Sequence, residues 1–155
     1  MSLVQQLAWG SLYLCLCLVL ETALLVWCMA VLTRIGKSLA GRSAVLSNGA
    51  VLLVSLGFIL AAHSAQVWIW ATAFVLSGAL PVWNTAVYFS LITYTTLGYG
   101  DVILEPGLRI FGGFAAVTGL LGFGVSTAFL VAVMGQTLRQ SRVVTPPDEG
   151  FMGKE

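Results

Sequence analysis

Residues 93–101 read Thr-Tyr-Thr-Thr-Leu-Gly-Tyr-Gly-Asp, and this stretch separates two apolar segments of the chain. A short apolar run, residues 82–94, leads into it, and a long apolar run, residues 108–138, follows it after a Pro-Gly pair. The short run cannot cross a bilayer, because a helix that spans the hydrocarbon needs about 20 apolar residues. Residues 82–94 are therefore predicted to form a re-entrant half-helix, with the glycine-containing stretch buried in protein or lining a watery cavity.

The composition of the whole chain agrees with a membrane environment. Of its 155 residues 59% are hydrophobic and 8% are charged, whereas a soluble domain carries about 25% charged residues. The net charge of +1 argues against nucleic-acid binding, which requires a basic stripe. The chain has one histidine, and it contains no nucleophile–base set and no phosphate-binding loop, so we expect no enzyme.

Two further apolar runs precede the half-helix. Residues 8–33 are long enough to cross about 30 Å of hydrocarbon at about 1.5 Å per residue, and residues 44–80 form the second run. The first run has no Lys or Arg before it and contains Glu21, which is untypical of a cleaved signal. The sequence thus predicts an all-α membrane protein with three spans and a re-entrant helix.

The cationic residues predict the orientation in the membrane. Arg34, Lys37 and Arg42 follow the first span, and Arg139 and Arg142 follow the last. Loops rich in Lys and Arg remain in the cytoplasm. We therefore expect a multi-pass protein of the inner cell membrane with its N-terminus outside, its C-terminus in the cytoplasm and the half-helix entering from outside.

Two glycines allow the stretch after the half-helix to adopt positive φ angles. A strand that aims successive carbonyls at one axis must alternate between left- and right-handed backbone regions. Gly98 and Gly100 meet this demand, because glycine adopts positive φ without a Cβ clash. Four such strands around an axis would present rings of oxygen atoms that replace the hydration shell of a cation.

Residues 96–101, Thr-Leu-Gly-Tyr-Gly-Asp, resemble the selectivity filter of potassium channels. The order of span, short helix, filter and span across residues 44–138 is similar to their two-helix pore module. Small prokaryotic members with one extra N-terminal span are the most similar to the whole chain. The resemblance implies a homotetramer in a lipid bilayer, because one filter strand cannot enclose an ion. It also divides the chain into an extra span with a basic loop (1–43), the pore module and a tail (139–155) that we expect to be disordered.

The resemblance also implies the residues that hold the ion. Backbone carbonyls of Thr96, Leu97, Gly98 and Tyr99, together with the Thr96 hydroxyl, would coordinate dehydrated K⁺ as the permeant ion, with no cofactor. Leu97 stands where Val or Ile is more usual. Its carbonyl would still coordinate K⁺, but its side chain would pack differently behind the filter.

Residues around the filter are expected to support it. We expect this role for Thr95, Gly100, Asp101, Tyr88, Phe89 and Ile92. Trp83 and Tyr94 could join Tyr88 and Phe89 in an aromatic cuff, with core packing or anchoring at the membrane interface as the alternative. Ile92 is a departure, because some relatives have at this position a Glu that contacts the filter Asp.

The last span resembles the inner helix of the family, in which a hinge glycine precedes residues that face the cavity. Gly119 occupies the hinge position, and Leu120, Phe123, Thr127 and Val131 recur on one helical face at i, i+3, i+7 and i+11. Glycine is also common in membrane helices because it permits close packing. A hinge and a packing role are thus both open for Gly119.

Glu21 and His63 are ionisable residues within predicted spans, at similar depths. Such groups are costly in a membrane and are usually paired. We therefore expect the two to meet and to tie the extra span to the pore module. The pair could sense protons, since histidine titrates near neutral pH, or it could be structural; the two could also be satisfied separately.

Features of the sequence also bear on alternatives to a potassium channel. Leu97 could loosen the filter and give a weakly selective cation channel. A proton-coupled transporter would use Glu21 and His63 as a relay, and a non-conducting anchor would be expected to have an altered filter. The chain has no arginine ladder for voltage sensing, and its tail is too short for a soluble ligand-binding domain.

Overall fold

The computed structural model describes residues 1–38 and 44–143, and within these ranges the chain is helical with no β-strand. The elements in order are α1 (Leu3–Ser38), α2 (Ala44–Leu76), α3 (Trp83–Tyr94), the short 3₁₀ helix η1 (Pro106–Leu108) and α4 (Arg109–Val143). Three of these helices are long and apolar enough to cross a membrane: α1, α2 and α4. The predicted all-α membrane fold with three spans and a short intervening helix is confirmed.

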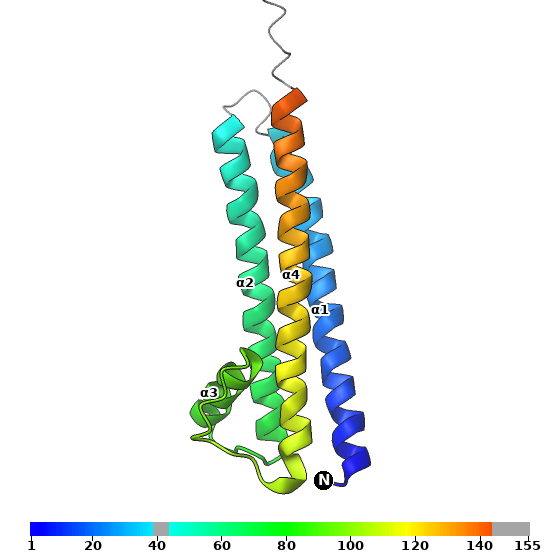
Figure 1. Ribbon diagram of the computed structural model, residues 1–155, viewed down its shortest axis with the longest axis vertical. Coiled ribbons are helices and arrows are strands. Elements are labelled where there is room, and N and C mark those ends of the chain that lie inside the picture. The colour runs from blue at the N-terminus through cyan, green and yellow to red at the C-terminus, as the bar shows by residue number, and fades with distance from the viewer. Residues whose placement is uncertain (39–43, 144–155) are drawn as a thin grey trace, which may run out of the picture.

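The three long helices lie side by side along the length of the molecule, and α3 lies beside one end of them (Figure 1). Helices α1 and α4 run in the same direction, and α2 runs against them (Figure 1). The N-terminus lies at the end of the bundle that carries α3, which we call the α3 end. The segment after α3 runs back along that helix to the α3 end before α4 begins (Figure 1).

Helix α2 ends before the apolar run does, because a glycine turn reverses the chain. Gly78 has φ of 71°, a value that glycine adopts without strain, and its N–H donates to the carbonyl of Val75. The N–H of Leu80 donates to the carbonyl of Phe74 over 3.1 Å. This is the pattern of a glycine-terminated helix, and it directs the chain into α3.

An aromatic core fixes α3 against the long helices. Phe74 of α2 is fully buried, and its ring lies 5.1 Å from that of Phe89 on α3 and 5.8 Å from that of Phe111 on α4. Tyr13 of α1 adds a ring 5.9 Å from Phe111. The hydroxyl of Ser90 on α3 donates to a backbone carbonyl of α2 over 2.7 Å. All four helices thus meet at the α3 end.

Helix α1 also caps the beginning of α4. The side-chain oxygen of buried Gln6 accepts the backbone N–H groups of Ile110 (3.2 Å) and Phe111 (3.4 Å). The first N–H groups of a helix lack partners within the helix, so a side chain that accepts them stabilises its start. This role of Gln6 was not predicted from the sequence.

At the opposite end of the bundle, α4 continues to Val143, past Leu138 where the span was predicted to end. Part of the predicted tail is therefore helical. The predicted disorder of the tail beyond Val143 and the position of Arg42 lie outside the described residues.

Candidate functional site

The segment predicted to be a filter, residues 96–101, has positive φ at every second residue. Thr96 has φ of 59°, Gly98 of 51° and Gly100 of 78°. The glycines were expected to adopt this conformation, but Thr96 was not. A β-branched residue in the left-handed region is strained by roughly 1–3 kcal/mol, and such strain persists where the surrounding structure over-determines the backbone.

Backbone hydrogen bonds join this segment to the end of α3. The N–H of Thr96 donates to the carbonyl of Thr93 over 2.9 Å, and the N–H of Gly98 donates to the carbonyl of Ile92 over 3.0 Å. The side chain of Ile92 is buried. Ile92 therefore contributes to the segment through its backbone, and α3 and residues 96–98 are fastened together.

The far end of the segment is held by Asp101. The phenol of Tyr88 donates to Asp101 Oδ2 over 2.6 Å, and the backbone N–H of Val102 donates to Oδ1 over 3.1 Å. The bond to Asp101 raises the pKa of Tyr88 above its ordinary value, because loss of the phenolic proton would place two negative charges together. The side-chain contact to Asp101 thus comes from Tyr88, which was expected to support the filter in another way, and not from position 92.

The side chains of the segment lie on the surface of the single chain. Leu97 is 55% exposed and Tyr99 is 68% exposed, and Thr95 and Thr96 are exposed as well. Exposed apolar and aromatic side chains in the single chain are free to pack against another chain or against lipid.

Gly119 lies where α4 passes the end of α3. A methyl group at position 119 would overlap the backbone carbonyl of Tyr94. Gly112, also in α4, lies equally close to a neighbour, since a Cβ there would be 2.7 Å from a methyl of Leu104. The close-packing role considered for Gly119 is therefore present, and its role as a hinge stays a prediction.

The four residues predicted to face a cavity lie exposed on α4: Leu120, Phe123, Thr127 and Val131. The ring of Phe123 also packs 4.6 Å from the ring of His63 and 5.7 Å from that of Tyr94. Phe123 thus connects this face of α4 to the residues behind the end of α3. The cavity itself stays a prediction.

Glu21 of α1 is fully buried between three helices. Its Oε1 accepts the hydroxyl of Ser126 on α4 over 2.7 Å, and its Oε2 accepts the amide Nε2 of Gln66 on α2 over 3.2 Å. Ser126 and Gln66 are themselves buried. A carboxylate in hydrocarbon requires such donors, and these bonds join α1 to both neighbouring helices.

The hydrogen bonds continue from Gln66 to the end of α3. The phenol of Tyr94 donates to Gln66 Oε1 over 3.0 Å, and Nδ1 of His63 lies 2.7 Å from the same phenolic oxygen. Within residues 1–38 and 44–143, Glu21 and His63 are thus linked through Gln66 and Tyr94 and not by a bond of their own. Tyr94 points into the bundle instead of joining an aromatic cuff.

Gly122 makes room for this buried polar chain, which comprises Glu21, Gln66, Tyr94 and His63. A Cβ at position 122 would lie 2.8 Å from Glu21 Oε2 and 3.2 Å from the Tyr94 hydroxyl. Gln66 and Ser126 were not among the predicted site residues, and Gly122 was not predicted to adjoin Glu21. The available signal was the presence of rare polar residues inside apolar runs, with Gln66 one helical turn after His63.

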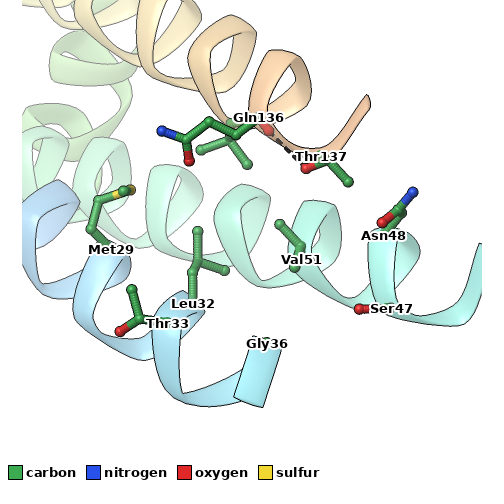
Figure 2. A pocket seen from close by; sticks show the side chains of 10 residues that line it. Met29, Leu32, Thr33, Gly36, Ser47, Asn48, Val51, Gln136 and Thr137 are labelled. Carbon is green, nitrogen blue, oxygen red and sulfur yellow. Dashed lines mark hydrogen bonds between the residues drawn. The ribbon is translucent and has the colours of Figure 1, made fainter. Parts of the chain in front are cut away.

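A separate cavity of about 370 Å³ lies between α1, α2 and α4 near the end opposite α3 (Figure 2). Its lining includes apolar Met29, Leu32 and Val51 and polar Thr33 and Asn48. It shares no residue with the predicted filter or the buried polar chain. Among the described residues, no group of three or more His, Cys, Asp or Glu side chains could hold a metal ion.

Comparison with known proteins identifies the family. A sequence model described as an ion channel matches residues 50–136, which begin in α2, include α3 and the predicted filter, and end in α4. Searches of curated proteins and of solved structures give no match. The match covers more than half of the chain, and three helices are long and apolar enough to span a bilayer. The protein is therefore a multi-pass membrane protein that belongs to this ion channel family.

Proposed function

We propose that the protein is a potassium-selective channel that conducts K⁺ passively through a homotetrameric pore lined by residues 96–101. The observation that carries this proposal is the alternation of positive φ at Thr96, Gly98 and Gly100. Such alternation lets successive peptide groups direct their carbonyls to one side. Four chains around an axis would then surround a dehydrated K⁺ with the carbonyls of residues 96–99 and with the Thr96 hydroxyl.

The surroundings of the segment support a cation pathway. Helix α3 ends at Tyr94 with Thr95 as its C-cap, and the partial negative charge of a helix C-terminus favours a cation at that end. Asp101 places a carboxylate at the far end of the segment. A permeating cation would therefore meet favourable electrostatics on both sides of the proposed filter.

The tetramer and its orientation belong to the same proposal. Leu97 and Tyr99 are exposed in the single chain and would be covered by the neighbouring copies. Arg34 and Lys37 lie near the end of α1, and Arg139 lies near the end of α4, all remote from α3. The positive-inside rule puts that end in the cytoplasm of the cell, with the N-terminus and the mouth of the proposed filter outside.

Flux through reconstituted protein tests this function. In liposomes that hold a K⁺ gradient, we expect K⁺ flux that Ba²⁺ blocks and no flux when Na⁺ replaces K⁺. Equal flux of the two ions would instead support a weakly selective cation channel with a filter loosened by Leu97. Saturable flux coupled to protons would support a transporter.

A pair of glycine variants ties the flux to the segment. Gly98→Ala places a side chain where φ is 51°, so it should distort the segment and abolish selective flux. Gly57→Ala is the matched control, because Gly57 lies within α2 and a methyl there meets no atom within 4 Å. Unchanged selectivity in Gly98→Ala would contradict the assignment of the filter.

A further inference from the structure

We propose that Glu21 is a proton-binding site that regulates conduction, because proton uptake by its carboxylate reverses the buried polar chain, which passes through Tyr94 at the end of α3 and ends at His63. The regulatory part of this proposal rests on the proposed channel function. The proton-binding part does not, since it concerns groups that lie outside the filter.

The hydrogen-bond donors of the chain have a fixed direction when Glu21 is ionised. The single hydroxyl hydrogen of Tyr94 goes to Gln66 Oε1, so His63 must donate from Nδ1 to the phenolic oxygen. Gln66 then donates from Nε2 to Glu21. Every donor from His63 onward thus points toward the carboxylate, which accepts a second bond from Ser126.

Within residues 1–38 and 44–143, the side-chain partners of Glu21 are the uncharged Ser126 and Gln66. The sequence contains no Lys or Arg from residue 1 to 33, from 43 to 108 or from 110 to 138. Among the described residues, the ionisable groups that interact with it are Cys17, buried one turn away on α1, His63 on α2 and Tyr94 on α3. Helix α4 presents Ser126 and Gly122 to it, neither of them ionisable. A proton is therefore the counter-charge that this buried site can take up.

Proton uptake can be followed atom by atom. One proton binds Glu21 Oε2, and the new O–H donates to Oε1 of Gln66 after the amide has rotated by half a turn. The Nε2 of Gln66 then donates to the phenolic oxygen of Tyr94, and the Tyr94 hydroxyl turns to donate to Nδ1 of His63. The imidazole stays neutral by carrying its proton on Nε2, and Ser126 still donates to Oε1. One proton is gained overall, and Tyr94 remains a neutral phenol throughout.

His63 is placed to make the exchange between its two nitrogens. It lines an open pocket of about 210 Å³ that also includes Thr95 and Phe123. Water in this pocket can supply a proton to one ring nitrogen while the other nitrogen gives its proton up. A hydrogen-bonded chain with two complete arrangements is a two-state element of the kind on which switches depend.

The two arrangements act differently on a cation at the base of the filter. Tyr94 immediately precedes Thr95, and its carbonyl rests on Gly119 of α4. With Glu21 ionised, the negative ends of the chain's dipoles point toward His63, which lines the same pocket as Thr95 at the negative C-terminus of α3. With Glu21 protonated, the dipoles are reversed and the negative charge is gone. Acidification should therefore reduce cation occupancy and flux.

The experiment compares four proteins in liposomes from about pH 9 to about pH 5, a range that includes the titration of imidazole groups and of those carboxyl groups whose charged form is disfavoured by burial. The wild type should lose K⁺ flux on acidification by about 5-fold or more, the lower range of a typical coupling. Glu21→Gln and Tyr94→Phe should show pH-independent flux. Glu105→Gln, which changes an exposed carboxylate at the start of η1, is the matched control and should retain the wild-type pH profile.

Infrared difference spectra of the same proteins report proton uptake without any flux. The carboxylic-acid band that appears on acidification should include a component that is missing from Glu21→Gln but present in Tyr94→Phe. Tyr94→Phe thus separates proton binding, which it keeps, from the transmission to the filter, which it interrupts. Its small change in volume also keeps the test available if Glu21→Gln does not assemble.

The outcomes are distinct. A wild-type pH profile in Glu21→Gln or Tyr94→Phe would overturn the regulation, and the absence of the Glu21 band would overturn the proton site. A channel that conducts Na⁺ as well as K⁺ would refute the proposed selectivity, while the pH profile of its flux would still decide on Glu21. If no ion flows at all, the proposed function and the regulation both fail, and the infrared band alone decides on proton binding.

Discussion

The phenol of Tyr88 donates a hydrogen bond of 2.6 Å to Oδ2 of Asp101, which joins the middle of α3 to the far end of the proposed filter. The two residues are 13 positions apart in the sequence. The filter segment is thus held at both of its ends by the same helix, because the N–H groups of Thr96 and Gly98 bond to its last turn.

Removal of this phenol should loosen the outer end of the filter. Tyr88→Phe keeps the ring and deletes the donor to Asp101, so we expect shorter single-channel openings and a lower preference for K⁺ over Na⁺. Tyr13→Phe, which deletes a phenol from the aromatic core, is the control and should leave both properties unchanged. Openings of normal length in Tyr88→Phe would show that Asp101 is held by other means.

The same bond predicts a response to alkaline pH. The Tyr88 pKa is raised above its ordinary value of about 10, so the proton that makes the bond is fully present below that value. The stabilisation is lost as the pH rises through the raised pKa, when a phenolate would face the carboxylate. Wild-type openings should therefore shorten toward those of Tyr88→Phe above about pH 10 and not between pH 5 and pH 9, as single-channel recordings across this range can establish.

A methyl group at position 119 should disturb conduction by displacing the base of the filter. Gly119→Ala would overlap the carbonyl of Tyr94, and overpacking of this kind costs about 1–3 kcal/mol. We expect lower K⁺ flux and a lower temperature of tetramer dissociation, with Gly57→Ala again as the control. If Gly119→Ala retained tetramer stability and altered the open probability alone, the hinge role would be favoured over packing.

The cap that Gln6 provides should be measurable as stability. Gln6→Leu would leave the buried N–H of Phe111 and the part-buried N–H of Ile110 without their acceptor, and a buried unsatisfied group costs about 1–3 kcal/mol. Gln6→Glu should retain the cap, because a carboxylate also accepts these bonds and suits a helix N-terminus. Denaturation in detergent can measure whether Gln6→Leu is less stable than the wild type and Gln6→Glu. Gln5→Leu, at an exposed position, is the control. Equal stability of Gln6→Leu and Gln5→Leu would contradict the cap.

The spans and the half-helix could be predicted because they depend on local properties of the chain. The lengths of the apolar runs predicted the three long helices. The short run at residues 82–94 predicted α3 to within one residue of its observed start at Trp83. The positive φ values of Gly98 and Gly100 followed from the absence of a Cβ. Positive φ at Thr96 could not be foreseen, because no intrinsic preference of threonine favours it.

The hydrogen-bond partners of the buried polar groups could not be predicted from the sequence. The prediction that Glu21 and His63 meet used their depths, which helical rise fixes, but contact also depends on how each helix is rotated about its axis. The observed rotation brings Gln66 and Ser126 to Glu21 and leaves His63 to Tyr94. Packing of the whole bundle sets that rotation.

The bare backbone at Gly122 has a consequence for how the chain can be divided. Helices in lipid gain little from burying apolar surface against each other, so α1 depends on close contact and on the hydrogen bonds of Glu21 to stay attached. A fragment that begins at residue 44 would turn Gln66 and Ser126 toward hydrocarbon with the carboxylate gone and an empty notch at Gly122. The stability of the pore region thus depends on the first helix, although the two are separate segments of the sequence. A minimal channel built from residues 44–143 would need apolar residues at positions 66 and 126.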